Sequence, residues 1–219
     1  MDPGSISKAG PTLRGAELRA YVAARLDPWD RPAPPALRSD LDLNPDLDFA
    51  EPEDRAAAVL VPLVERAEGI SVLLTRRSDN LRKHRGQVAF PGGGIDPGEA
   101  PWQAALREAE EEVGLDRSLV SLAGLSTPFR SLTGFHITPV VGFVSPTFIP
   151  TPNPDEVAEV FETPFDFLMD AANHARELRE FPVGPSRWVY SITHNERTIW
   201  GITAAMVREL SRRLYGGDE

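Results

Sequence analysis

The chain has 219 residues, of which 41% are hydrophobic and 26% are charged, and it carries a net charge of −10 and no cysteine. These values are typical of a globular protein, and no apolar run approaches the roughly 18 residues of a membrane span. The lack of cysteine excludes disulfides, and the negative charge argues against binding to nucleic acid or anionic membranes. We therefore expect a cytoplasmic protein with neither kind of partner.

Two parts follow each other along the chain. Apolar residues at helical spacing predict a helix over residues 13–26. Residues 28–54 are rich in proline and acidic side chains, which predicts an extended or irregular connector. We expect residues 1–54 to form this N-terminal helix and connector, packed on or tethered to a single domain that spans residues 55–219.

Strand and helix patterns are interleaved in residues 55–219. Two apolar runs around residues 65–69 predict a β-hairpin, and a short strand over residues 87–90 ends at a glycine-rich loop. A helix is expected from Pro101, which suits a first turn, to Val113, with Gly114 as its stop. Further strands are expected over residues 118–125, 136–145, 157–162, 187–193 and 197–199, and further helices over residues 165–174 and 203–214. This order predicts an α/β (α+β) fold with a mixed sheet.

The predicted helix of residues 101–113 carries a cluster of acidic side chains. At about 100° per residue, Glu108, Glu111 and Glu112 fall within one arc beside the buried face, and Glu110 points to solvent. Like charges at this spacing repel one another and destabilise a helix. The arc is either a solvated face paired with lysine or arginine, or a site for a hard divalent cation such as Mg²⁺, which prefers carboxylate oxygens.

The spacing around this cluster resembles the Nudix box, the signature of the Nudix hydrolases. The resemblance rests on Gly93, Glu99 and the run REAEEEVGL over residues 107–115. It implies a Nudix fold, in which a mixed sheet is sandwiched between helices and the metal-binding helix lies in a loop–helix–loop motif. It also implies hydrolysis of a nucleoside diphosphate that is linked to another group.

The resemblance also implies a role for each residue of the box. Arg107 would orient the acidic side chains, with Glu99 as its salt-bridge partner, and Gly93 and Gly94 would let the loop approach the site closely. The implied ligands of Mg²⁺ or Mn²⁺ are Glu108, Glu111 and Glu112. One of these three carboxylates is also a candidate to take the proton from the attacking water.

A second motif stands immediately before the box. The residues LLTRRSDNLRKHRGQVAFPGG, at positions 73–93, resemble the motif of the coenzyme A pyrophosphatase branch of the Nudix family. That branch hydrolyses coenzyme A or its derivatives to 3′,5′-ADP and 4′-phosphopantetheine. Because guanidinium groups suit phosphates, we expect substrate contacts from Arg76, Arg77 and Arg82 in this basic stretch. The alternative is a basic loop that balances the acidic helix.

Three choices stay open at this level. Glu156 or Glu159 is a candidate for a further carboxylate that binds metal or transfers a proton, and an exposed acidic loop is the alternative. Coenzyme A or a derivative is the leading substrate, ADP-ribose or NADH is the alternative, and a non-catalytic nucleotide-binding module is a third hypothesis that the intact box argues against. The protein is expected to be a monomer or a homodimer.

Overall fold

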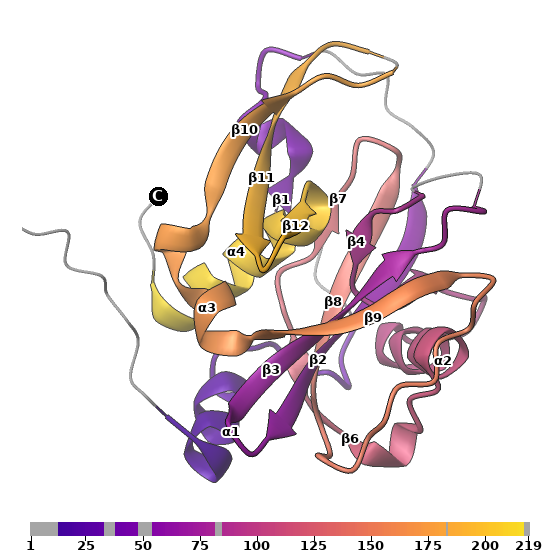
Figure 1. Cartoon of the computed structure of the whole chain (residues 1–219), viewed down its shortest axis with the longest axis vertical. Helices are drawn as coiled ribbons and strands as arrows, with labels where there is room; N and C mark the ends of the chain where they lie inside the picture. The colour runs from indigo at the N-terminus through magenta and orange to yellow at the C-terminus, as the bar shows by residue number, and fades with distance from the viewer. Residues whose placement is uncertain (1–12, 33–37, 48–53, 82–84, 183, 217–219) are drawn as a thin grey trace, which may run out of the picture.

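The largest element of the fold is a nine-stranded mixed sheet built around β2 (Arg55–Arg66). β2 pairs in parallel with β8 (Phe135–Val144) and antiparallel with β3 (Gly69–Arg77), the second strand of the predicted hairpin (Figure 1). The computed structural model describes residues 13–32, 38–47, 54–81, 85–182 and 184–216. The other strands of this sheet are β1 (Arg38–Ser39), β4 (Val88–Ala89), β5 (Gly92–Gly94), β6 (Val120–Leu125), β7 (Phe129–Arg130) and β9 (Val157–Pro164).

Helices cover both faces of this sheet. Along β2, Leu60 packs in the core beneath α2 (Pro101–Val113), and the next residue, Val61, packs in the core on the opposite face. The helices on that opposite face are α1 (Gly15–Ala23), α3 (Phe165–Met169) and α4 (Ile202–Tyr215). These two cores confirm the predicted fold class, a mixed sheet sandwiched between helices.

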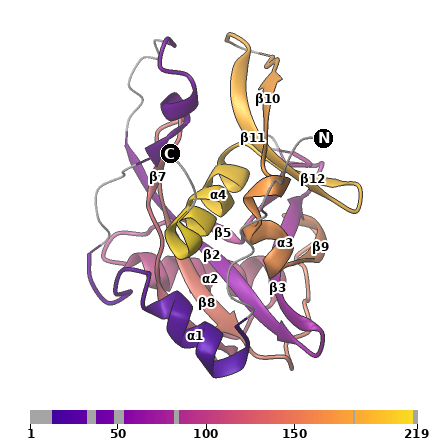
Figure 2. The same ribbon diagram turned by 90° about the vertical axis from the view of Figure 1, so that its left-hand side faces the viewer.

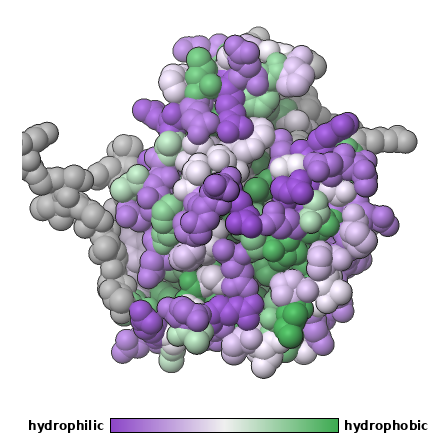
Figure 3. Space-filling view, in the orientation of Figure 1, coloured by the Kyte–Doolittle hydropathy of each residue, from purple (hydrophilic) through white to green (hydrophobic). Residues whose placement is uncertain are grey.

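The outer surface agrees with the composition. The face of the molecule in Figure 3 is mainly hydrophilic, and hydrophobic residues gather to the right of its centre, where β9 crosses in front of the sheet. No helix in the described part of the chain is long and apolar enough to cross a membrane.

A second, three-stranded sheet projects from the body as a ribbon (Figures 1 and 2). It consists of β10 (Ala175–Arg179), β11 (Arg187–His194) and β12 (Arg197–Trp200), all antiparallel. The sequence predicts β11 and β12 but extends the preceding helix to residue 174, whereas α3 ends at Met169. The helix prediction was wrong there because Asp170 caps a 3₁₀ turn of residues 171–173 after α3, its carboxylate accepting from the Ala172 N–H. The sequence also missed β10, which is mostly exposed and polar and shows no apolar alternation.

The described part of the connector, residues 38–47, is folded onto this body rather than irregular. β1 pairs in parallel with β7, and a single 3₁₀ turn (Asp40–Leu43) leads to Asn44. The buried Asn44 amide bonds both backbone groups of Trp188 in β11: Nδ2 donates to the carbonyl at 3.0 Å, and Oδ1 accepts from the N–H at 2.8 Å. One side chain therefore completes β11 at a place where β12 has already ended.

Replacing Asn44 with alanine should destabilise the protein by about 1–3 kcal/mol, because it leaves two backbone groups of β11 without partners. Urea unfolding of the variant measures this loss. Asp46→Ala is the control, since Asp46 lies exposed in the same segment, and it should change the stability by less than about 0.5 kcal/mol. Equal stability of the two variants would show that water satisfies Trp188 equally well.

Candidate active site

The acidic residues lie on α2, whose two ends agree with the sequence prediction. Pro101 begins the helix, and Gly114 ends it with a left-handed backbone (φ +69°) that favours glycine. The carboxylates differ in exposure, because Glu112 is only 3% exposed, Glu108 is half-buried and Glu111 is open to solvent. The three candidate ligands thus run from the interior of the protein to its surface.

The glycine run lies against Glu108. The sequence predicts a loop here, whereas Gly92–Gly94 forms the short strand β5, antiparallel to β2. The loop prediction was wrong because glycine has a low strand propensity and no side chains to alternate. A Cβ atom at Gly92 would lie 2.6 Å from Val59 Cα, and one at Gly93 would lie 2.5 Å from Glu108 Cδ. Only glycine lets this strand come so close to β2 and to the carboxylate.

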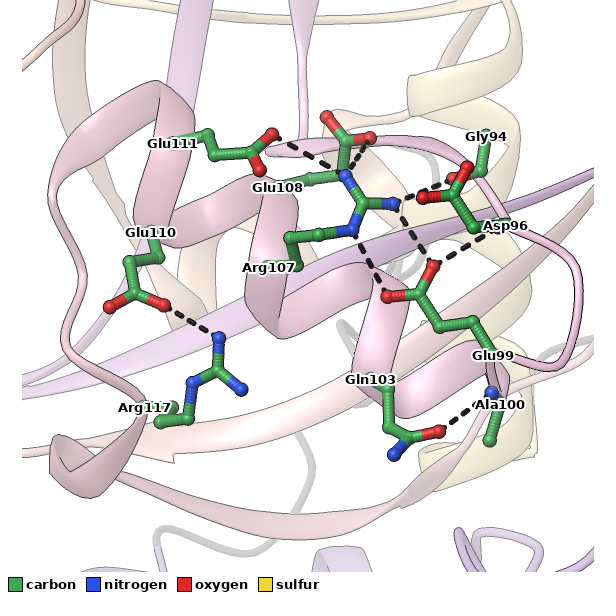
Figure 4. Close-up of polar contacts among 10 residues, drawn as sticks. All are labelled: Gly94, Asp96, Glu99, Ala100, Gln103, Arg107, Glu108, Glu110, Glu111 and Arg117. Atoms are coloured by element: carbon green, nitrogen blue, oxygen red, sulfur yellow. Dashed lines mark hydrogen bonds and ion pairs between the residues drawn. The ribbon is translucent and has the colours of Figure 1, made fainter.

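Arg107 lies at the centre of a network of ion pairs on α2 (Figure 4). Its guanidinium bonds both carboxylate oxygens of Glu99 at 3.0 Å, and it also donates to the Gly94 carbonyl at 3.0 Å. The same group contacts Glu108 at 2.8 Å and Glu111 at 3.4 Å. The hydrogen bond from Arg107 lowers the pKa of Glu99, which therefore stays ionised near neutral pH. The salt bridge expected between Glu99 and Arg107 is present.

Glu112 forms a buried pair with an arginine of the preceding motif. Arg77 Nη1 lies 3.7 Å from Glu112 Oε1, whereas Glu112 Oε2 is buried without a hydrogen-bond partner among the described residues. Burial raises the pKa of Glu112 to about 8, and the charge of Arg77 opposes this shift only in part. Burial also raises the pKa of Glu108, again against the pull of its neighbour Arg107. Burial therefore disfavours the charged form of two of the three candidate ligands.

The loop ahead of β9 brings Glu156 to the same place. The N–H groups of Thr151 and Asn153 donate to the Val113 and Glu112 carbonyls at 2.8 and 2.9 Å, which satisfies the last turn of α2. Glu156 follows in the same loop. Burial is the main cause of the raised pKa of Glu112, and the negative charges of Glu108 and Glu156 add to it. Glu156 is thus a fourth carboxylate beside the helix.

Glu159, the other candidate in this loop and strand, is engaged differently. Arg197 Nε donates to Glu159 Oε1 at 3.0 Å, and Arg76 Nε lies 3.8 Å from Glu159 Oε2. Arg76 also pairs with Asp79 at 3.2 Å. The sequence contains no signal for the contact with Arg197, because the two residues are 38 positions apart in the chain. Arg82, the remaining predicted substrate contact, lies outside the described residues.

These differences predict different effects of two matched substitutions. If Glu156 is the further carboxylate expected from the sequence, Glu156→Gln should lower kcat by about 100-fold or more, because it would remove a proton acceptor near Glu112. Glu159→Gln should lower it less than about tenfold, because that carboxylate already binds two arginines. Steady-state kinetics at saturating Mg²⁺ tests both. A larger loss of kcat in Glu159→Gln than in Glu156→Gln would assign the proton transfer to Glu159.

The residues fit a divalent metal ion. Among the described residues, the buried Glu112 Oε2 has no hydrogen-bond partner, which favours a ligand beside it. Because glycine has no side chain, Gly93 leaves room for the Glu108 carboxylate. Within the described ranges, however, no three carboxylate or imidazole groups yet converge as a set of ligands. Glu112 is buried beside Arg77 instead, and Glu108 and Glu111 contact the Arg107 guanidinium. A bound metal ion would require these two side chains to turn away from Arg107.

Comparison with known proteins identifies the family of this chain. The family model described as the NUDIX domain matches residues 54–181. The chain is 41% identical over 173 residues to a Nudix hydrolase NudL of Citrobacter koseri, itself uncharacterized, covering 78% of this chain and 89% of that one. It is 40% identical over the same length to the NudL protein of Escherichia coli O1:K1 / APEC, with the same coverage. An Ap4A hydrolase from C. elegans has a TM-score of 0.45 and 23% identity, over 53% of this chain and 86% of that one.

The molecule is therefore a hydrolase with a mixed sheet between helices and an acidic helix at its site. The chain belongs to the Nudix family. As a Nudix hydrolase it acts on a small molecule of the nucleoside diphosphate type. Members of this family generally use divalent metal ions.

Proposed function

We propose that this Nudix hydrolase cleaves the pyrophosphate bond of coenzyme A or one of its derivatives, with Mg²⁺ or Mn²⁺, to give 3′,5′-ADP and 4′-phosphopantetheine. One observation carries the proposal: Arg77, from the motif that resembles the coenzyme A branch, lies 3.7 Å from Glu112 of the box. Two motifs that follow each other in the sequence thus contribute side chains to the same point. A guanidinium so close to the carboxylates is well placed to bind a phosphate beside them.

In this proposal each carboxylate has a distinct task. The metal ions, held by Glu108, Glu111 and Glu112, would neutralise the pyrophosphate and lower the pKa of the attacking water. Glu156, which has no role in holding Arg107, would accept a proton from that water. Before metal binds, Arg107 would hold Glu108 and Glu111 on the surface of α2, and its contact with Glu99 would keep the guanidinium in place.

The cations along β3 would hold the substrate phosphates. Arg77 has a buried Nε without a hydrogen-bond partner among the described residues, so one edge of its guanidinium is available for an anion. Arg76, the preceding residue, forms ion pairs with Glu159 and Asp79, so only part of its guanidinium would be available to a phosphate. Coenzyme A carries a 3′-phosphate in addition to its pyrophosphate, and a group of arginines suits such a substrate.

The proposal is tested by identifying the products by mass after incubation with coenzyme A and Mg²⁺. ADP-ribose and NADH run in parallel as competing substrates, and Glu112→Gln is the inactive control. Glu110→Gln is the matched control on the same helix, because Glu110 is exposed and pairs only with Arg117 among the described residues. We expect 3′,5′-ADP and 4′-phosphopantetheine from the wild type and from Glu110→Gln.

Other outcomes have separate meanings. Preferred cleavage of ADP-ribose or NADH would keep the site chemistry but replace the substrate. Binding of these nucleotides without any turnover would make the protein a nucleotide-binding module instead of an enzyme.

Replacing Arg77 with lysine should raise the KM for coenzyme A if its planar guanidinium binds phosphate, since lysine keeps the charge but loses the two parallel hydrogen bonds.

A further inference from the structure

A cavity of about 330 Å³ lies away from the acidic helix, between α4, β11 and residues 38–43. Figure 2 shows the arrangement: the β10–β11 ribbon stands on one side of α4, and the purple segment of residues 38–47 stands on the other. None of the box residues lines the cavity. Its size is at the lower end of the range for small-molecule sites, about 300–1,000 Å³. The lining residues that matter here are Arg38, Phe129, Trp188, Tyr190, Arg208 and Arg212.

Two of the three arginines in the wall are held by one buried acid. Glu209 accepts from Arg38 Nε at 3.2 Å and from Arg212 Nη2 at 2.6 Å, and Thr127 donates to it at 3.2 Å. The Glu209 side chain is 8% exposed, so these contacts fix the wall of the cavity. Glu209 thus compensates part of the positive charge of these two arginines.

The acids on the opposite wall are engaged as well. Asp40 accepts the Leu132 N–H at 3.2 Å, and Asp42 lies 3.8 Å from Arg38 and accepts the Ser39 N–H at 3.3 Å. Both carboxylates are therefore tied to the connector and its neighbours. They do not offer a free site for a cation.

Arg208 differs from the other two arginines. It is half-buried, and across the ranges that the structure describes it forms no ion pair with a carboxylate. Its guanidinium instead lies over the ring of Tyr190, 4.9 Å from the centroid, which holds it at the cavity. A half-buried guanidinium without a counter-charge favours an anionic ligand beside it.

Trp188 supplies a flat apolar surface at the same cavity. The residue is 48% exposed, which is unusual for tryptophan, yet the Asn44 amide bonds both of its backbone groups. The backbone of Trp188 is thus fixed at the edge of the cavity before any ligand arrives. Flat rings stack well on an exposed indole at such a position.

We propose that this cavity is a second binding site, which takes an anionic ligand with a flat ring: Arg208 binds the phosphate or carboxylate group and Trp188 stacks on the ring. Two sources have this chemistry. One is a separate small nucleotide, and the other is the nucleotide end of the substrate itself, a possibility that rests on the proposed function. The site is the same in both cases.

Calorimetric titration with adenosine 5′-monophosphate, as a probe that contains no pyrophosphate, tests the proposal in full-length protein. The parent is the Glu112→Gln variant in Mg²⁺ buffer, so that coenzyme A is not consumed in the later step. We expect saturable binding that is weakened about tenfold or more by Arg208→Gln and about fivefold or more by Trp188→Ala. Arg213→Gln is the matched control, because Arg213 lies on the same helix, pairs with Asp27 and does not line the cavity.

The outcomes separate clearly. No binding of the probe, or equal binding by the parent and by the Arg208→Gln and Trp188→Ala variants, would overturn the proposal. Thermal unfolding of each variant shows whether it is folded, and either of the two substitutions suffices for the test. A repeat with saturating coenzyme A then identifies the source: displacement of the probe places the substrate in the cavity, and simultaneous binding indicates a separate ligand. The result of the titration with adenosine 5′-monophosphate does not depend on whether the protein hydrolyses coenzyme A.

Discussion

Replacing Glu112 with glutamine should lower the hydrolysis rate by at least about 100-fold and, at the same time, make the metal-free protein more stable. The loss of rate follows from the proposed role as a metal ligand, because the loss of a mere supporting contact to a ligand already costs about 10–100-fold. The gain in stability follows from the environment of the carboxyl group. Its side chain is buried, and its only ion pair in the described residues is the 3.7 Å contact with Arg77.

The sign of this gain depends on pH. Folding raises the pKa of Glu112 from 4.5 to about 8, so between these values the unfolded chain loses a proton that the folded protein keeps. The carboxyl group thus destabilises the metal-free fold increasingly as pH rises through this window, and glutamine does not. The difference in melting temperature between Glu112→Gln and wild type, measured in EDTA, should widen from about pH 5 to about pH 8. A lower melting temperature for the variant at every pH would make Glu112 a structural residue.

Adding one methyl group to the glycine strand should affect different properties at adjacent positions: stability at Gly92 and activity at Gly93. Gly92→Ala should cost at least about 3 kcal/mol of stability, because the new Cβ would lie 2.6 Å from Val59 Cα in the backbone of the central strand β2, which cannot move easily. Gly93→Ala should cost only about 1 kcal/mol, since its new Cβ meets the flexible end of Glu108, 2.5 Å from Cδ. The displaced carboxylate should instead lower kcat by about tenfold or more.

Urea unfolding and steady-state kinetics on the two variants separate these effects. Gly94→Ala is the control for stability, because a Cβ there would meet no atom within 4 Å, and it should change the stability by less than about 0.5 kcal/mol. Full activity of Gly93→Ala would mean that the position of Glu108 relative to β5 does not matter for the reaction.

The sequence predicted those parts of the fold that local chemistry determines. Both ends of α2 are correct because Pro101 and Gly114 act through their own backbone preferences. β5 was missed because its strand pairing needs the absence of side chains, which leaves no pattern to recognise. The short strand and the 3₁₀ turn in the connector had no pattern in the sequence, because their partners, in β7 and β11, lie far along the chain.

The candidate site shows the same division. The acidic cluster follows from spacing along one helix, and the resemblance to the Nudix box implied the pairing of Arg107 with Glu99 that the structure shows. The sequence could not distinguish the surroundings of Glu156 and Glu159, because Glu159 contacts Arg197, which comes from the second sheet. It also could not predict that Glu112 is buried and Glu111 exposed, since this difference arises from how β2 and β9 pack against α2.

Arg107 gives the protein a way to fold before it meets a metal ion. Its guanidinium already offsets the repulsion between Glu108 and Glu111, so the acidic helix is stable with a cation that is part of the chain itself. In the proposed enzyme, loading is then an exchange of one positive partner for another instead of a step of assembly. Such a protein has no need of metal delivery during its synthesis, and its activity would rise and fall reversibly with the concentration of free divalent ions around it.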